Sequence, residues 1–101
     1  MLTVNNVVKD NDSTITKYDC NFIAECDGSG IWADTNGRKV QVSAITVHEY
    51  ESFMHVNVTH DSTWDIYSDY GFANAISKAL GYKVRFTEQG MQDDNYASLE
   101  A

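Results

Sequence analysis

Alternation of apolar and polar residues predicts a long strand in the first quarter of the chain. In STITKYDCNFIAEC (13–26), every second residue is apolar or small, and the residues between them are mainly polar. A period of two is typical of a half-buried β-strand. A shorter strand is expected at 2–8, and DGSG (27–30) is expected to turn the chain. The predicted inward face comprises Tyr18, Cys20, Phe22, Ala24 and Cys26.

The next pattern predicts a tight β-hairpin over IWADTNGRKVQV (31–42). Asn36 and Gly37 are the preferred pair for a two-residue type I′ turn, in which both central residues have positive φ. This register places Ala33 opposite Val40, so that apolar residues of the two strands share one face.

A second hairpin is predicted from SFMHVNVTH (52–60) and the segment 63–67 that follows it. A connecting loop of three to five residues places Val56 opposite Ile66 and keeps one face apolar. A two-residue loop would mix the faces, so the longer loop is preferred.

The helical period appears once, and it predicts a helix over about 69–80. Ser68 or Asp69 can cap its start, and Gly81 suits the left-handed position after its end. Its apolar stripe is spaced at i, i+4, i+7 and i+8 and comprises Phe72, Ile76, Ala79 and Leu80.

Alternation returns after the helix, at 82–88, where Tyr82, Val84 and Phe86 are expected to point inward. At 96–101 we expect either a last edge strand or a frayed end. We therefore predict a single α+β domain over 1–101. It is a twisted, mainly antiparallel sheet of five to six strands, with the helix packed on one face.

Charge changes this picture more than any other feature of the composition. Fifteen acidic and seven basic residues give a net charge of −8, and 43% of the residues are hydrophobic. The chain is thus expected to fold and to be repelled by nucleic acid and anionic membranes. The acidity favours a basic protein partner, and simple solubility is the alternative.

The start of the chain, MLTVNNVVKDND, has no basic segment followed by an apolar run, so we expect no signal peptide and a cytoplasmic location. Cys20 and Cys26 lie in one predicted strand, about 20 Å apart, which is too far for a disulfide. Both are expected to be free thiols in a reducing compartment.

His55 is the best candidate for acid–base chemistry. The preferred hairpin register places it opposite Tyr67 and diagonal to Asp65, and a carboxylate can fix the tautomer of a catalytic histidine. No nucleophile or oxyanion-stabilising turn accompanies it. A small enzyme or ligand-binding domain using these three residues remains an alternative function.

Metal and cofactor sites are not predicted. The potential ligands show no HExxH, CxxC or calcium-loop spacing. They comprise His48, Glu49, Glu51, His55, His60 and Asp61.

Acidic side chains on the outward faces of the strands form the preferred candidate site. On a strand, residues i and i+2 lie roughly 6.6 Å apart, close to the spacing of successive phosphates. Such a surface could occupy a basic groove, and aromatic side chains would add contact area. The predicted partner-binding residues are Asp19, Glu25, Trp32, Asp34, Asp65, Tyr67 and Tyr70, with Glu49 and Glu51 as further acidic positions.

In size, acidity and lack of a catalytic motif, the chain resembles the small inhibitors that bacteriophages encode against host enzymes, including DNA mimics and anti-CRISPR proteins. This resemblance is one of composition, and these proteins share no motif that assigns residues. It implies a non-enzymatic protein that blocks a basic, nucleic-acid-handling host protein. Self-association through a sheet edge is a further alternative.

Overall fold

The computed structural model describes residues 2–30, 35–62, 66–87 and 95–101. Within those residues, one helix packs against a six-stranded antiparallel sheet, which confirms the predicted α+β class. In chain order the elements are β1 (Thr3–Lys9), β2 (Thr14–Glu25), β3 (Lys39–Glu49), β4 (Met54–His60), α1 (Tyr70–Leu80), β5 (Arg85–Phe86) and β6 (Tyr96–Glu100).

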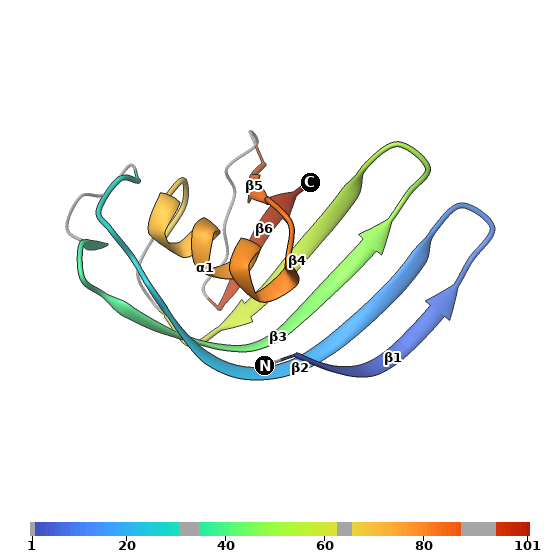
Figure 1. Cartoon of the computed structure of the whole chain (residues 1–101), viewed down its shortest axis with the longest axis horizontal. Helices are drawn as coiled ribbons and strands as arrows, with labels where there is room; N and C mark the ends of the chain where they lie inside the picture. Colours follow the sequence, from blue (N-terminus) through green and yellow to red (C-terminus); the bar gives the residue numbers. More distant parts are fainter. Residues whose placement is uncertain (1, 31–34, 63–65, 88–94) are drawn as a thin grey trace.

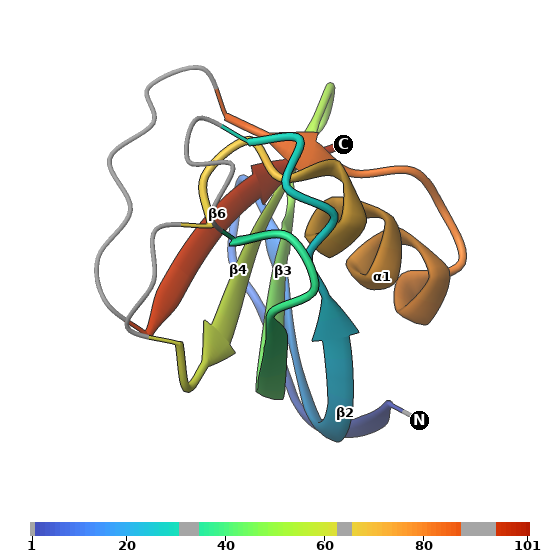
Figure 2. The ribbon, with the colours of Figure 1, turned by 90° about the vertical axis from the view of Figure 1, so that its left-hand side faces the viewer.

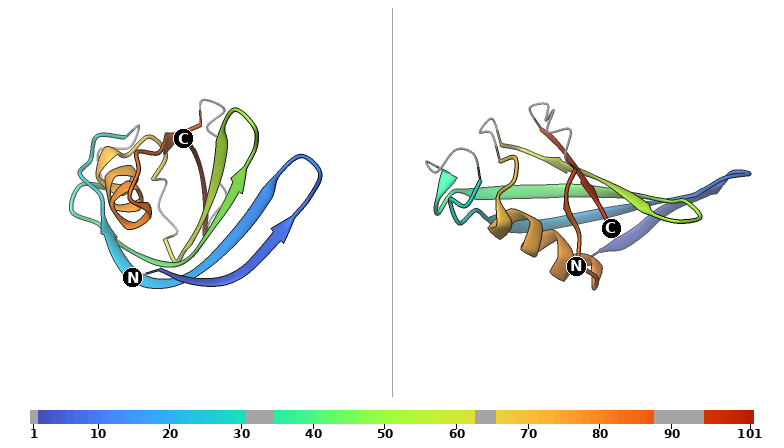
Figure 3. Two further views of the ribbon diagram at one scale, coloured as in Figure 1. Left: turned by 45° about the vertical axis from the view of Figure 1, so that its right-hand side comes forward. Right: turned by 90° about the horizontal axis from the view of Figure 1, so that it is seen from above.

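The sheet has the strand order β1-β2-β3-β4-β6-β5 and curls around the helix. Its concave face holds α1, and none of the described residues forms a helix on its convex face (Figures 1 and 3). The helix covers only one end of the sheet. At the other end, the β1–β2 and β3–β4 hairpins project beyond it, which gives the molecule its length of 42 Å.

The alternation in β2 is confirmed, because Tyr18, Cys20, Phe22 and Ala24 face the core while the residues between them are exposed. The register with β3 shifts between Asp19 and Phe22, which marks a bulge in this long strand. Bulges bend a strand and increase its twist, so this one helps the sheet to curl around α1.

Phe72 of α1 lies at the centre of the core and has no exposed surface. Its ring contacts those of His60 and Phe86, each with a centroid distance of 5.9 Å. Burial of a phenylalanine side chain stabilises a fold by about 1.5–3 kcal/mol. The remaining buried apolar residues come mainly from β2, β3, β4, β6 and α1 and include Val40, Val42, Ile45, Val56, Val58, Ile76 and Leu99.

The predicted ends of α1 are confirmed. Asp69 is the N-cap and its side chain accepts a hydrogen bond from the Phe72 backbone N–H, at 3.0 Å. Gly81 follows the helix with a φ of 86°, and its N–H donates to the Ser77 carbonyl. Both ends therefore follow the capping rules that the sequence indicates.

Asp69 does more than cap the helix. Its carboxylate is fully buried and also accepts hydrogen bonds from the backbone N–H groups of Asp27 and Gly28 and from the Thr35 hydroxyl, each at 3.1 Å. One side chain thus joins the start of α1 to the segment after β2. Four donors around one carboxylate are enough to compensate for its burial.

The first predicted hairpin is wrong. Residues 31–34, which include Ala33, lie outside the described residues, but Val40 pairs with Ala24 of β2. Asn36 does not have the positive φ that a type I′ turn requires. The chain instead turns where the Arg38 N–H donates to the Thr35 carbonyl. The Asn36–Gly37 pair therefore marks a local turn and is not the type I′ turn of a two-residue hairpin.

The second predicted hairpin is also wrong. The partners of β4 are β3 and β6, so Val56 pairs with Val47 and Leu99 and not with Ile66. The expected C-terminal edge strand is instead an inner strand, with the two-residue β5 outside it. The apolar pattern of β4 specified which face is buried, and it could not specify which strand lies beside it.

Candidate functional site

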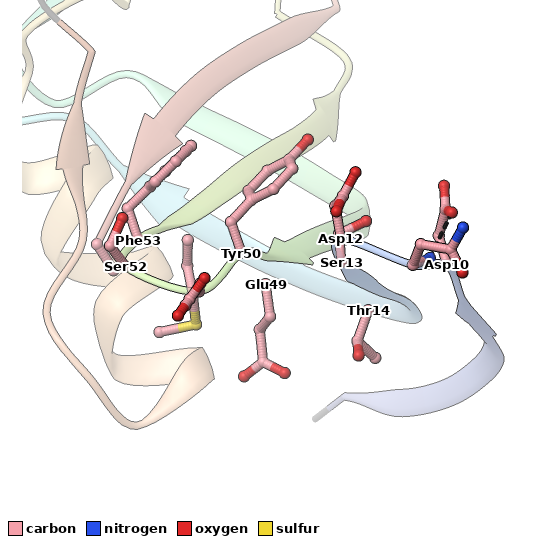
Figure 4. Close-up of a pocket in the computed structure, with 12 residues that line it drawn as sticks. Asp10, Asp12, Ser13, Thr14, Glu49, Tyr50, Ser52 and Phe53 are labelled. Atoms are coloured by element: carbon pink, nitrogen blue, oxygen red, sulfur yellow. Dashed lines mark hydrogen bonds between the residues drawn. The ribbon is translucent and has the colours of Figure 1, made fainter.

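An acidic groove lies between the ends of the two projecting hairpins. It has a volume of about 890 Å³ and is lined by the β1–β2 turn, the β3–β4 turn and the strand ends beside them (Figure 4). Its carboxylates and aromatic rings, which we call the acidic groove residues, are Asp10, Asp12, Glu49, Tyr50, Glu51 and Phe53.

Strand pairing explains why the two turns lie side by side. Thr14 at the start of β2 pairs with Glu49 at the end of β3, so the two hairpins end at the same level. Each turn is closed by a backbone hydrogen bond, from Asp10 N–H to the Ser13 carbonyl at 2.8 Å and from Tyr50 N–H to the Phe53 carbonyl at 2.9 Å. The groove is therefore built on a hydrogen-bonded framework.

The groove carries charge of one sign. Four carboxylates line it, and no described residue that lines it is basic. A concave surface lined by one sign of charge concentrates its field and attracts ions of the other sign. Figure 4 shows Asp12 pointing to the same side as the aromatic rings and Glu49 pointing to the opposite side.

Tyr50 and Phe53 form an exposed aromatic pair beside these carboxylates. Their side chains are 39% and 51% exposed, and their rings stack with centroids 4.7 Å apart. The row continues through His48, at 6.5 Å from Tyr50, to His55, at 6.0 Å from His48. Exposed aromatic side chains anchor protein interfaces and also hold lysine and arginine through cation–π contacts.

Of the residues predicted to bind a partner, those that the structure describes do not gather in one cavity or groove. Asp19 and Glu25 lie on the convex face, where Glu25 is opposite Lys39 of β3. Trp32, Asp34 and Asp65 lie outside the described residues.

Tyr67 and Tyr70 are brought together, but away from the acidic groove. They line a second cavity of about 580 Å³ with Lys83, Arg85 and Phe86. Among the described residues, the two tyrosines therefore share this cavity with basic residues and not with the predicted carboxylates Asp19 and Glu25.

The predicted pairing of His55 with Tyr67 is also incorrect, and its predicted neighbour Asp65 lies outside the described residues. In the sheet His55 is opposite His48 on one side and Glu100 on the other, and Tyr67 is not beside it. The Tyr67 hydroxyl instead donates to the Thr87 carbonyl, at 3.0 Å. Among the described residues, no three histidine, cysteine, aspartate or glutamate side chains gather as a metal site.

Both cysteines are free thiols, as predicted. Burial, together with the carboxylates of Asp69 and Asp27, raises the pKa of the Cys26 thiol to about 12. Burial also raises the pKa of Cys20. Neither thiol is thus activated as a nucleophile at neutral pH.

Sequence reasoning missed most of the acidic groove because it read strands and turns separately. Asp10 and Asp12 lie in a turn, and they were given no role, while Tyr50 and Phe53 were not considered. The available signal was the length of the strands, since hairpins of matched length place their turns together. The N-terminal turn and the turn after 49 could have been paired on that basis.

The part of the chain that the structure describes has no helix that is both long and apolar enough to cross a membrane. No family model, curated protein or solved structure matches this chain.

Proposed function

We propose that this is a non-enzymatic binding protein whose acidic groove holds a basic segment of a partner protein. The observation that supports the proposal most is that carboxylates of two adjacent turns line the same groove as the exposed Tyr50–Phe53 stack, without a basic residue among the described lining residues. We further propose that the partner handles nucleic acid and that binding occludes the surface it uses for phosphates. The compositional resemblance to phage-encoded inhibitors and the net charge of −8 support this second step.

Complementarity is the physical basis of the proposal. A lysine- or arginine-rich surface that binds phosphates presents closely spaced cations, and carboxylates from two adjacent turns offer closely spaced anions. The stacked rings add an apolar area over which a guanidinium or a methylene chain can lie. The charges would then govern the association rate, and the aromatic contacts would slow dissociation of the complex.

Binding of a fluorescein-labelled peptide of alternating lysine and arginine, followed by fluorescence anisotropy, tests the first step. The groove variant Asp12→Asn/Glu51→Gln is compared with the control variant Asp19→Asn/Glu25→Gln. Each variant removes two negative charges and so changes the net charge by the same amount, from −8 to −6. We expect the groove variant to weaken binding at least about fivefold and the control variant to change it by less than about twofold.

Equal weakening by both variants would show attraction to the overall charge and would contradict the groove as the site. Affinity for the peptide should also fall at least about tenfold between low and high salt, because salt screens exposed charges. Tyr50→Ala/Phe53→Ala should weaken binding at both salt concentrations, since it removes contact area and not charge.

Occlusion is tested with proteins captured from the host cytosol on the immobilised chain and identified by mass spectrometry. Duplex DNA should release a captured nucleic-acid-handling protein, and the groove variant should capture less of it than the control variant does. A partner that binds the chain and DNA at the same time would contradict occlusion.

The exposure of β1 favours self-association as a second candidate function. All seven residues of this edge strand are exposed, including Val7 at 49% and Val8 at 47%. An uncovered edge can pair with the same edge of a second copy. Light scattering after size-exclusion chromatography should then show a dimer that persists in high salt. Val7→Lys should give a monomer, whereas Ile23→Lys, at an equally exposed position on the convex face, should not.

A further inference from the structure

The cavity beside Tyr67 and Tyr70 has a chemistry opposite to that of the acidic groove. It is lined by residues from the N-terminal half of α1 and from the segment that leads into β5. Figures 1 and 2 show how the chain runs from the end of α1 to β5. Its volume of about 580 Å³ is within the usual range for small-molecule sites. The cavity is also separate from the hairpin ends, so it needs an explanation of its own.

The inner part of this cavity is apolar and fixed in place. Ala73 and Val84 are buried in its wall, with exposed fractions of 5% and 3%. The rings of Tyr67 and Phe86 meet edge to face with centroids 5.6 Å apart, and the hydrogen bond to the Thr87 carbonyl holds the Tyr67 hydroxyl. Fixed aromatic walls suit a flat apolar group, because little ordering is needed on binding.

The rim of the cavity is basic. Lys83 and Arg85 are two of only seven basic residues in the chain, and none of the described residues that line the cavity is acidic. Arg85 also lies 3.3 Å from Glu100, in an ion pair whose arginine side is exposed and therefore screened by water. A guanidinium has five N–H donors, so one carboxylate leaves others to bind an anion.

Further polar groups surround these two cations. Asn74 and the exposed Tyr70 lie one helical turn apart on α1 and offer an amide and a hydroxyl. Ser68, at the rim, has a φ of 62°, a conformation that is uncommon for residues other than glycine and that is enriched at functional sites. Cations and hydrogen-bond donors above an aromatic floor together resemble a site built for an amphipathic anion.

We propose that this cavity binds a small aromatic carboxylate, with the ring against Tyr67 and Phe86 and the carboxylate between Lys83 and Arg85. The proposal does not rest on the acidic groove or on the identity of its partner. A chain with a net charge of −8 repels nucleic acid and anionic membranes, because both carry many negative charges over a large surface. A small monoanion is affected mainly by the charges within a Debye length of it, which here include Lys83 and Arg85.

Titration of the ¹⁵N-labelled protein with 2-naphthoate, followed by amide chemical shifts, tests the proposal. We expect shifts confined to 67–74 and 83–87, with a Kd of about 1 mM or tighter for a ligand of this size. The neutral 2-naphthylmethanol should bind at least about fivefold more weakly. Absence of binding, shifts spread over the sheet, or equal affinity for the neutral compound would each overturn the proposal.

Variants separate the local field from the overall charge. Lys83→Gln/Arg85→Gln should weaken 2-naphthoate binding at least about fivefold, while the control Lys9→Gln/Lys17→Gln makes the same change in net charge and should leave it within about twofold. Equal effects of both variants would overturn the proposal. If the amide spectrum of Lys83→Gln/Arg85→Gln shows that this variant is not folded, the salt dependence of 2-naphthoate binding to the wild-type protein provides the test instead. Affinity for 2-naphthoate that did not fall with added salt would then contradict a role for the cations.

Discussion

The two ends of the sheet use the same kinds of residue for different purposes. At the covered end, α1 packs on the concave face, and Phe72 and Asp69 are both without exposed surface. At the open end, the hairpins project without a helix, and Phe53 and Asp12 are exposed. The buried phenylalanine and aspartate at the covered end thus stabilise the fold, whereas the phenylalanine and aspartate at the open end are exposed to solvent.

This difference shows that acidity alone does not identify a functional residue here. The carboxylate of Asp69 has four hydrogen-bond donors from three parts of the chain, so its charge is used within the fold. The carboxylates of the acidic groove lie on hairpin turns, where they add little to stability. Position relative to α1, and not the number of acids, separates structural carboxylates from those available to a partner.

Replacing the two phenylalanines should give the largest contrast between the ends. Phe72→Ala should lower the free energy of unfolding by about 4 kcal/mol, because it leaves a cavity in the core. Phe53→Ala should lower it by less than about 1 kcal/mol, since that ring is half exposed and loses mainly its stack on Tyr50. Urea unfolding monitored by circular dichroism measures both, and similar losses would contradict the division into two ends.

The two aspartates should give the next largest contrast. Asp69→Ala leaves the N–H groups of Asp27, Gly28 and Phe72 without their acceptor, so we expect a loss of about 3 kcal/mol. Asp12→Ala should change stability by less than about 0.5 kcal/mol. The same unfolding experiment compares them, and hydrogen exchange of the Phe72 amide should accelerate in the Asp69 variant if the helix start is loosened.

Much of the fold could be predicted because periodicity reports on local structure. The alternation in β2, the stripe on α1 and its two caps each follow from residues close together in the chain. Strand pairing could not be predicted in the same way. The apolar residues of β4 fit β6 as well as they fit the segment after β4, and only the whole fold decides between them.

The candidate sites were less predictable for the same reason. Tyr67 and Tyr70 were identified, but the basic residues that share their cavity come from beyond α1. Asp69 was recognised as a helix cap, and its bonds to the segment after β2 depend on a contact 41 to 42 residues away. A site built from residues that are distant in the sequence can be predicted only when the topology of the fold is already known.

Gly71 tests how closely the covered end is packed. A Cβ at this position would lie 2.6 Å from the Glu25 carbonyl oxygen and 2.8 Å from the Asp27 nitrogen, and both of these are backbone atoms. Gly71→Ala should therefore lower the free energy of unfolding by about 1–2 kcal/mol, although alanine is the better helix former. Asn74→Ala, at an exposed position of the same helix, is the control and should be neutral or slightly stabilising. A stabilising Gly71→Ala would mean that the helix start is not held against β2.

Asp27 should give the smallest effect, and one that depends on pH. Its carboxylate accepts hydrogen bonds from the Ser29 hydroxyl and backbone N–H, which hold its pKa below the ordinary value although the side chain is exposed. The Ser29 hydroxyl in turn accepts from the Tyr70 N–H at 2.8 Å, so this network supports the start of α1.

A depressed folded-state pKa means that the ionised form of Asp27 contributes stability above its unfolded-state pKa and loses it as the pH falls through the folded-state value. Wild type should therefore be more stable than Asp27→Asn at about pH 7, and the difference should shrink as the pH falls below the unfolded-state pKa of about 3.9. Urea midpoints across this range measure wild type and Asp27→Asn. A difference for Asp27→Asn that grew on acidification would show that the carboxylate is held in its protonated form, and the hydrogen bonds from Ser29 would then have to be assigned differently.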